Sequence, residues 1–222
     1  MDIKKEALRK DAAEKAAALS AARKTAAELL EHRVQEELSQ LDMPKVRFRT
    51  EFSAKAGEWG LDETGQDEVQ FLMSANVGEA LKPIQKVASG GELARIMLAL
   101  KNVLAEDDGI GSLVFDEVDT GVSGRAAQKV AEKMSQVARH KQVLCVTHLP
   151  QIAAMADTHF SVEKGERNGR TFTRVNRLEQ LARQQELARL IGGTAMTDAI
   201  LRSAEELLGQ AVSYKDAARK TK

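Results

Sequence analysis

The chain has 222 residues, enough for one large domain or for a domain with an appendage. Aromatic residues make up only 4% and charged residues 30%, which favours a helix-rich, α/β or coiled-coil protein over a β-sandwich. Lys plus Arg and Asp plus Glu both number 33, so no basic field covers the whole surface and any DNA contact must be local.

The first 41 residues predict one long helix. They contain no Gly or Pro, and their apolar residues recur mostly at spacings of three and four: Leu8, Ala12, Ala16, Leu19, Ala22, Ala26, Leu29, Leu30, Val34, Leu38 and Leu41. This apolar seam is narrow, rich in alanine and flanked by charges. It favours one strand of a coiled coil over a surface helix that lies on the domain. The partner strand that such a seam needs is not found in the sequence.

An antiparallel pair of strands and a helix follow. Met43-Pro44 ends the long helix, because proline disfavours the helical conformation of the residue before it. Residues 46–52 alternate apolar and polar side chains, and a second strand is predicted over 69–75. Apolar residues at helical spacing from Gly91 to Leu104 then predict a helix that faces the core.

The middle of the chain predicts a β-α-β unit. Two short apolar strands, Leu113–Phe115 and Val143–Val146, flank a helix from about Ser123 to Arg139, which predicts a parallel sheet covered on both faces. The single cysteine, Cys145, lies in the second strand and excludes an internal disulfide or a thiolate metal cluster. With no signal-peptide pattern and no apolar run that could span a bilayer, we expect a cytoplasmic protein without a membrane segment.

A hairpin and two helices complete the predicted elements. Residues 160–163 and 171–175 are joined through Asn168-Gly169, a typical hairpin turn. Helices near 178–191 and 198–208 are separated by Gly192-Gly193, which suits a helix C-terminal cap. We expect the charged residues at the end of the chain to fray.

Two adjacent carboxylates, Asp116 and Glu117, follow the first strand of the β-α-β unit. Open α/β sheets bind ligands at the carboxyl edge of their strands. At that edge one carboxylate can hold a magnesium ion while the other polarises an attacking water. A strand that simply ends in two solvated acids is commoner, so this pair alone does not define a site.

A Ser-Gly-Gly sequence and a histidine accompany the carboxylates. Ser89, Gly90 and Gly91 open a helix, where free N–H groups and the helix dipole favour a phosphate and glycine lets the backbone approach it. His148 follows the second parallel strand, at the same edge as Glu117, where it can contact a terminal phosphate or place the water. Each feature alone is weak, but the ordered set indicates a nucleotide-hydrolysing site.

Three segments, "KVASGGELARIMLALK", "LVFDEVDTGVSGRAAQKV" and "VLCVTHLPQIAAMAD", together resemble the C-terminal lobe of ABC-type ATPase heads. The resemblance is strongest to the SMC-like branch that acts in bacterial DNA repair, and it covers nearly the whole chain. It implies an α/β fold with a mostly parallel sheet and flanking helices, preceded by one coiled-coil helix. The implied domains are a returning coiled-coil strand over 1–42, the head lobe over 43–212 and a charged, disordered tail over 213–222.

The same resemblance implies a role for each site residue. Asp116 would be the magnesium ligand, Glu117 the general base and His148 the switch histidine. The signature motif, which contacts the γ-phosphate of ATP on the opposite head of a dimer, would comprise Ser89, Gly90, Gly91 and Glu92. The loop that crosses the dimer interface would comprise Asp119, Thr120, Gly121 and Ser123, although "VDTGVSG" departs from the Ser-Ala-Leu-Asp usual in transporters.

The phosphate-binding Walker A motif, Gly-x-x-x-x-Gly-Lys-Ser/Thr, does not occur, and the sequence contains no Gly-Lys dipeptide. The resemblance places that motif on an N-terminal lobe. We therefore expect the C-terminal part of such a protein, as an engineered fragment, a truncated gene or one subunit of a split protein. The implied cofactors are ATP and Mg²⁺. The implied partners are the N-terminal lobe, a second head in a homodimer and DNA at double-strand breaks, with association with the nucleoid during repair.

More than one function remains open from the sequence. The leading hypothesis is the C-terminal half of an ATPase for recombinational repair of DNA double-strand breaks, active only when an N-terminal lobe completes it. Glu117 and His148 favour this hypothesis. The missing Walker A motif favours the alternative, a non-catalytic interaction module. A head from another SMC-like protein or a transporter is the third possibility, and the long coil over 1–41 argues against a transporter.

Overall fold

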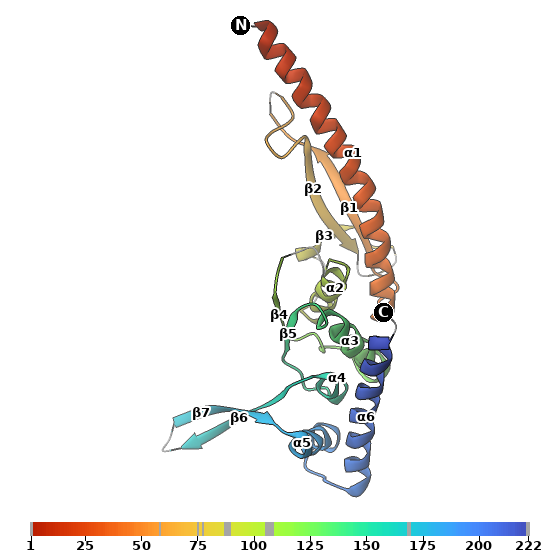
Figure 1. Ribbon diagram of the computed structural model, residues 1–222, viewed down its shortest axis with the longest axis vertical. Coiled ribbons are helices and arrows are strands. Elements are labelled where there is room, and N and C mark those ends of the chain that lie inside the picture. The colour runs from red at the N-terminus through yellow and green to blue at the C-terminus, as the bar shows by residue number, and fades with distance from the viewer. Residues whose placement is uncertain are drawn as a thin grey trace. The chain divides into compact units, whose positions relative to one another are not determined.

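The computed structural model describes residues 2–57, 59–74, 76, 78–86, 90–104, 109–167 and 170–220. The chain divides into two compact units, Met1–Ser89 and Gly90–Lys222 (Figure 1). In the described part of the chain, no helix combines the length and apolar content that crossing a bilayer requires.

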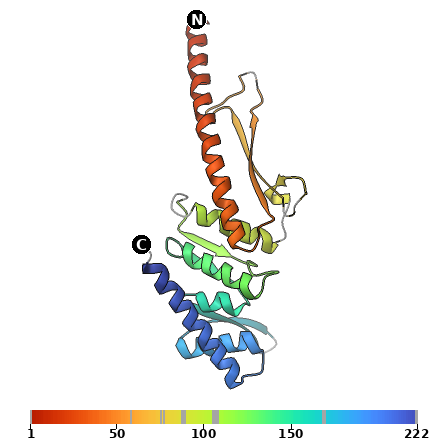
Figure 2. The same cartoon turned by 90° about the vertical axis from the view of Figure 1, so that its right-hand side faces the viewer.

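The first unit is a long helix beside a small antiparallel sheet. Helix α1 (Asp2–Gln40) confirms the predicted helix, and strands β1 (Arg47–Ala54) and β2 (Asp67–Ser74) confirm the predicted pair, with Arg47 opposite Ser74. Figures 1 and 2 show the helix running along both strands. A short strand, β3 (Lys82–Pro83), extends the sheet and a 3-10 helix, η1 (Ile84–Lys86), follows it. Neither was predicted.

One face of α1 packs on this sheet. Its buried residues recur at helical spacing: Ala16, Ser20, Ala27, Val34 and Leu38. Glu31 joins the helix to β1, because its carboxylate accepts the Thr50 N–H at 2.6 Å and pairs with Arg49 at 2.5 Å. A second stripe, formed by Leu8, Leu19 and Leu29, is 41 to 62% exposed. The sheet-facing part of α1 therefore matches the surface-helix alternative, while coiled-coil pairing through the exposed stripe stays a prediction.

The second unit contains the predicted β-α-β order. Helix α2 (Gly90–Val103) precedes β4 (Ser112–Phe115), α3 (Gly124–Val137) and β5 (Gln142–Cys145). Strands β4 and β5 pair in parallel, with Phe115 opposite Cys145. The core gathers side chains from α2, α3 and the turn after β4, all at most 2% exposed: Ile96, Leu98, Val118, Val130 and Val137.

One face of the parallel sheet is open. The face that carries Phe115, which is 6% exposed, is covered. On the opposite face Val114, Leu144 and Val146 are 71, 49 and 65% exposed. The prediction of a sheet covered on both faces is therefore wrong for the described residues, because they supply cover for one face only.

The rest of the second unit follows the predicted order with one added helix. A short helix, α4 (Pro150–Met155), was not predicted. Strands β6 (His159–Arg167) and β7 (Arg170–Leu178) form the predicted hairpin, although its Asn168-Gly169 turn lies outside the described residues. Helix α5 (Gln180–Gly192) ends as predicted at Gly193, whose φ is 62° and whose N–H donates to the Arg189 carbonyl at 2.8 Å.

The last helix, α6 (Asp198–Lys220), continues through the residues predicted to be a disordered tail. Side chains beyond residue 208 attach it to the unit. Ala211 is 5% exposed, the Tyr214 hydroxyl accepts a hydrogen bond from Gln136 at 3.0 Å, and Lys215 pairs with Asp157 at 2.7 Å. Tertiary contacts therefore keep a charged segment helical.

Candidate nucleotide site

The carboxyl ends of β4 and β5 bring the predicted residues to one edge of the parallel sheet. The Val146 N–H donates to the Phe115 carbonyl at 3.0 Å, which extends the strand pairing to the point where both strands end. Asp116 and Glu117 follow β4 and are exposed, and His148 lies three residues past β5 with its side chain 73% exposed. Both strands thus deliver polar groups to the edge where α/β sheets bind ligands.

Glu117 has an unusual backbone conformation. Its φ is 60°, in the left-handed region, which a residue with a Cβ adopts at a cost of about 1–2 kcal/mol. The Thr120 N–H donates to the Glu117 carbonyl at 3.1 Å and closes a tight turn after β4. Strain of this kind is concentrated at functional sites. Residue identity gave no signal for it, because glutamate rarely takes this conformation.

Helix α2 begins directly against this turn. A Cβ placed on Gly90 would lie 2.7 Å from Glu117 Oε2, and one on Gly91 would lie 2.7 Å from the Thr120 carbonyl oxygen. Real Cβ atoms essentially never approach other atoms to less than 3.0 Å, so both positions are filled by neighbours. The structure therefore brings the predicted signature glycines against Glu117 within one unit. Ser89 lies outside the described residues, and Glu92 is half-buried.

Arg95 joins α2 to the same turn and was missed from the sequence. Its side chain is 7% exposed and Nη1 donates to the Thr120 carbonyl at 2.8 Å. Burial lowers the pKa of this guanidinium, and its Nε has no hydrogen-bond partner. The sequence did offer a signal, because Arg95 stands next to Ile96 among the apolar residues of a helix that faces the core. A cation in such a place is buried only if it makes a particular contact.

Asp119 points into the unit and not toward solvent. The residue is 3% exposed, and its Oδ2 accepts hydrogen bonds from the Thr147 hydroxyl at 2.6 Å and the His148 N–H at 2.9 Å. The same oxygen lies 3.0 Å from His148 Nδ1. Thr120, Gly121 and Ser123, the other members of the predicted interface loop, are exposed.

The donor groups at this edge suit one type of metal ion. Among the described residues, no group of three or more His, Cys, Asp or Glu side chains is close enough to form a metal cage. Burial, with Asp119 and Asp116 nearby, raises the pKa of Cys145 to about 12, so its thiol stays protonated near neutral pH. Mg²⁺ is commonly held by one or two carboxylates together with substrate phosphates, and the exposed Asp116 fits that pattern.

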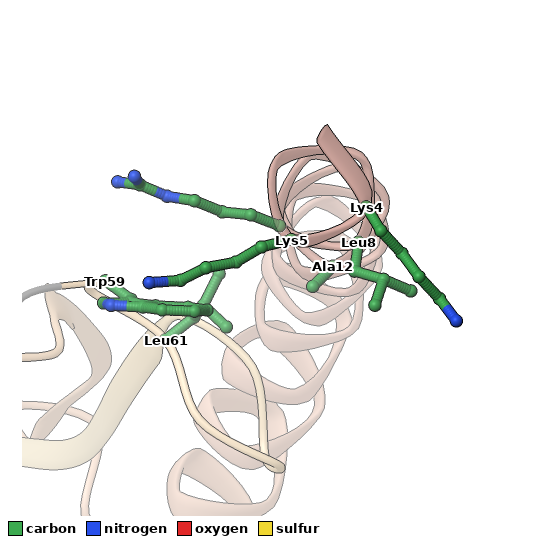
Figure 3. A pocket seen from close by; sticks show the side chains of 7 residues that line it. Lys4, Lys5, Leu8, Ala12, Trp59 and Leu61 are labelled. Atoms are coloured by element: carbon green, nitrogen blue, oxygen red, sulfur yellow. The ribbon is translucent and has the colours of Figure 1, made fainter. Parts of the chain in front are cut away.

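A hollow of about 510 Å³ lies away from these residues, in the first unit between α1 and the loop after β1 (Figure 3). Leu8, Ala12 and Leu61 line it beside Trp59, and Lys5 Nζ and Arg9 Cζ lie 5.5 and 5.6 Å from the centroid of the Trp59 ring. These cation–π contacts attach the loop to the helix. None of the predicted site residues lines the hollow, so we do not identify it with the candidate site.

Comparison with solved structures shows which known fold the chain shares. The Smc head domain with a coiled coil and joint from Pyrococcus yayanosii matches 72% of this chain and 28% of that chain, with a TM-score of 0.51 and 22% sequence identity. This likeness concerns the fold alone. Together with the order of the elements, it makes the fold that of an Smc head domain.

Sequence comparison identifies the particular family. No protein-family model matches the chain. The DNA repair protein RecN of Bacillus subtilis (strain 168) is 46% identical over 227 residues, which cover 96% of this chain and 39% of that protein. RecN of Halalkalibacterium halodurans is 48% identical over 191 residues, with coverage of 86% and 34%. The chain belongs to the RecN family and corresponds to the C-terminal part of its members. It spans between 34 and 39% of the length of these two relatives.

Proposed function

We propose that the chain supplies the C-terminal half of an ATPase head that acts in the repair of DNA double-strand breaks. An N-terminal lobe with the Walker A motif would complete the head. One observation carries this proposal. The start of α2 packs against Glu117 in the turn after β4, and His148 lies at the same edge of the sheet as this turn. A strand that merely ended in two solvated acids would not need glycines against its second carboxylate.

Each side chain then has a distinct task. Bound ATP with Mg²⁺ supplies the phosphoryl group and the charge that polarises it. Asp116 would hold the metal, and Glu117 would accept the proton of the attacking water. The start of α2 offers backbone N–H groups to a γ-phosphate held by a second head. His148 presents its ring to the terminal phosphate or to the water.

The open face of the parallel sheet supports an N-terminal lobe as partner. Parallel sheets are normally covered on both sides, yet Val114, Leu144 and Val146 are exposed in the described part of this chain. The hairpin adds a second apolar group of three exposed side chains, Phe160, Val162 and Val175, with Val162 opposite Val175. A lobe that covered both groups would bury them and complete the sheet.

Further partners follow from the family. The relatives are named DNA repair proteins, which supports DNA as a partner and a cytoplasmic site of action on the nucleoid. We also propose a homodimer of heads, a returning coiled-coil strand over 1–42 that pairs through the exposed stripe of α1, and a head lobe that begins at residue 43.

The test is reconstitution from the full chain and the N-terminal segment of a RecN relative that carries Walker A. The complex should hydrolyse ATP in a Mg²⁺-dependent way, and neither part should do so alone. Glu117→Gln is the matched control, because it keeps the shape and removes the base, and turnover should fall about a hundredfold or more. A stable complex without turnover, or one in which the variant is as active as the wild type, would favour the interaction module.

A further inference from the structure

Asp119 is the one acidic residue that is fully buried in the part of the chain the structure describes. We propose that Asp119 is a positioning residue, which holds the ring of His148 in one orientation and one tautomer. The inference rests on the proposed function for its catalytic meaning, but its structural claim stands on contacts within this chain. The family resemblance implied a different place for Asp119, in a loop that crosses a dimer interface.

A buried carboxylate is costly unless hydrogen bonds compensate for the lost water. Asp119 Oδ2 receives them from the segment that follows β5, at 2.6 Å from the Thr147 hydroxyl and 2.9 Å from the His148 N–H. The Thr147 hydroxyl in turn accepts the Leu149 N–H at 3.0 Å. These hydrogen bonds hold the backbone of residues 147–149 beside the turn after β4.

The contact with the ring has a separate consequence. His148 Nδ1 lies 3.0 Å from the same carboxylate oxygen, and the side chain is otherwise 73% exposed. A carboxylate can only accept a hydrogen bond, so this separation favours a ring that carries its proton on Nδ1. Nε2 then faces away from Asp119 in both charge states of the ring. It accepts a hydrogen bond when the ring is neutral and donates one when the ring is charged.

The opposite tautomer is disfavoured by simple electrostatics. With the proton on Nε2, the Nδ1 lone pair would face the Asp119 oxygen and the two would repel each other. In the same way, carboxylates fix the tautomer of histidines that bind metals or activate nucleophiles. Asp119 therefore keeps Nε2 as the ring atom that meets a phosphate oxygen or the attacking water.

The tautomer can be measured on the full chain without nucleotide. Ring ¹⁵N chemical shifts at a pH where the ring is neutral report which nitrogen carries the proton, and His148→Gln assigns the signals among the four histidines. The wild type should show the Nδ1–H form, and Asp119→Ala should move the population toward Nε2–H, the form that an imidazole prefers when no acceptor faces Nδ1. Thr147→Val, which removes a hydroxyl and leaves the carboxylate, should keep Nδ1–H. A wild-type ring in the Nε2–H form overturns the proposal, even if the variant does not fold. So does an unchanged population in a folded Asp119→Ala chain.

A second measurement separates positioning from a merely structural role. In heads completed with an N-terminal lobe, Asp119→Ala should lower kcat about tenfold or more with little change in KM. In a His148→Gln background the same substitution should have no further effect, because the ring it orients is gone. An equal loss in both backgrounds would mean that Asp119 only supports the fold. If completed wild-type heads hydrolyse no ATP, the proposed function fails, while the tautomer measurement still decides the role of Asp119.

Discussion

Alanine at the two glycines that open α2 should have opposite effects on stability. Neither glycine has a positive φ, so alanine is compatible with both backbone conformations and only the added methyl group matters. At Gly91 the methyl would meet fixed backbone, 2.7 Å from the Thr120 carbonyl oxygen and 3.1 Å from that of Glu117. At Gly90 it would meet only the end of a flexible side chain, 2.7 Å from Glu117 Oε2.

These distances set the expected magnitudes. Ordinary contacts of a Cβ begin at 3.4 Å, so the turn after β4 would have to move by several tenths of an ångström to admit a methyl at Gly91. Overpacking of this kind costs about 1–3 kcal/mol, against about 0.5–1 kcal/mol that alanine gains over glycine in a helix. We expect Gly91→Ala to lose about 1–2 kcal/mol, or about 2–8 °C in Tm at about 2–4 °C per kcal/mol. Gly90→Ala should leave Tm unchanged or slightly raised, since Glu117 can rotate away.

Thermal unfolding of the two variants beside the wild-type chain, followed by circular dichroism, measures the difference. ATP turnover in completed heads provides the complementary readout. Gly90→Ala should reduce turnover at unchanged stability, because it displaces the Glu117 carboxylate. Equal losses of Tm in the two variants, or no loss in either, would show that α2 does not begin against the turn after β4, and the geometry of the candidate site would be refuted.

Three further predictions concern the chain alone. Glu117→Gly should raise Tm relative to Glu117→Gln, because glycine relieves the left-handed strain of about 1–2 kcal/mol and glutamine does not; equal Tm values would contradict the positive φ. The pKa of Cys145 is raised to about 12 from an ordinary 9.0, so thiol labelling at pH 8 should be about a thousandfold slower than in the denatured chain. Because the folded chain holds this proton more tightly than the unfolded chain, the free energy of unfolding should fall as pH rises from 9 toward 12. Labelling at the rate of the denatured chain would show that the thiol is not buried. Hydrogen exchange should be faster in α1 over 3–15 than over 27–40, where the helix packs on the sheet; uniform exchange would mean that this packing does not persist in solution.

Local patterns predicted most elements because the patterns report local physics. Alternation over residues 46–52 marked a strand with one buried face, and Gly193 marked the end of α5 because glycine takes a positive φ without strain. The two-residue strand β3 carried too few residues for a pattern. The continuation of α6 depended on the partners of Tyr214 and Lys215, which lie far away in the sequence.

The candidate site was predictable as a set of residues but not as a set of contacts. The order of strands and helices implied that Glu117 and His148 reach one edge, because parallel strands end on the same side. The inward direction of Asp119 and the hydrogen bond from Arg95 to the Thr120 carbonyl depend on how turns and helices pack against each other. No spacing rule in a single sequence encodes these distances. The motif suggested an interface role for Asp119, and it gave no sign that this residue is buried.

The close packing of Gly91 also bears on how this family changes over time. A glycine whose Cβ would lie 2.7 Å from a neighbouring carbonyl oxygen is under selection for folding as well as for any contact with a phosphate. A descendant that lost ATP hydrolysis would still be penalised for replacing it. Gly91 would thus outlast the activity, whereas Glu117, with a strained backbone and an exposed side chain, would be among the first residues to drift. In comparing members of this family, the residue at position 117 is therefore a better marker of the proposed catalysis than Gly91.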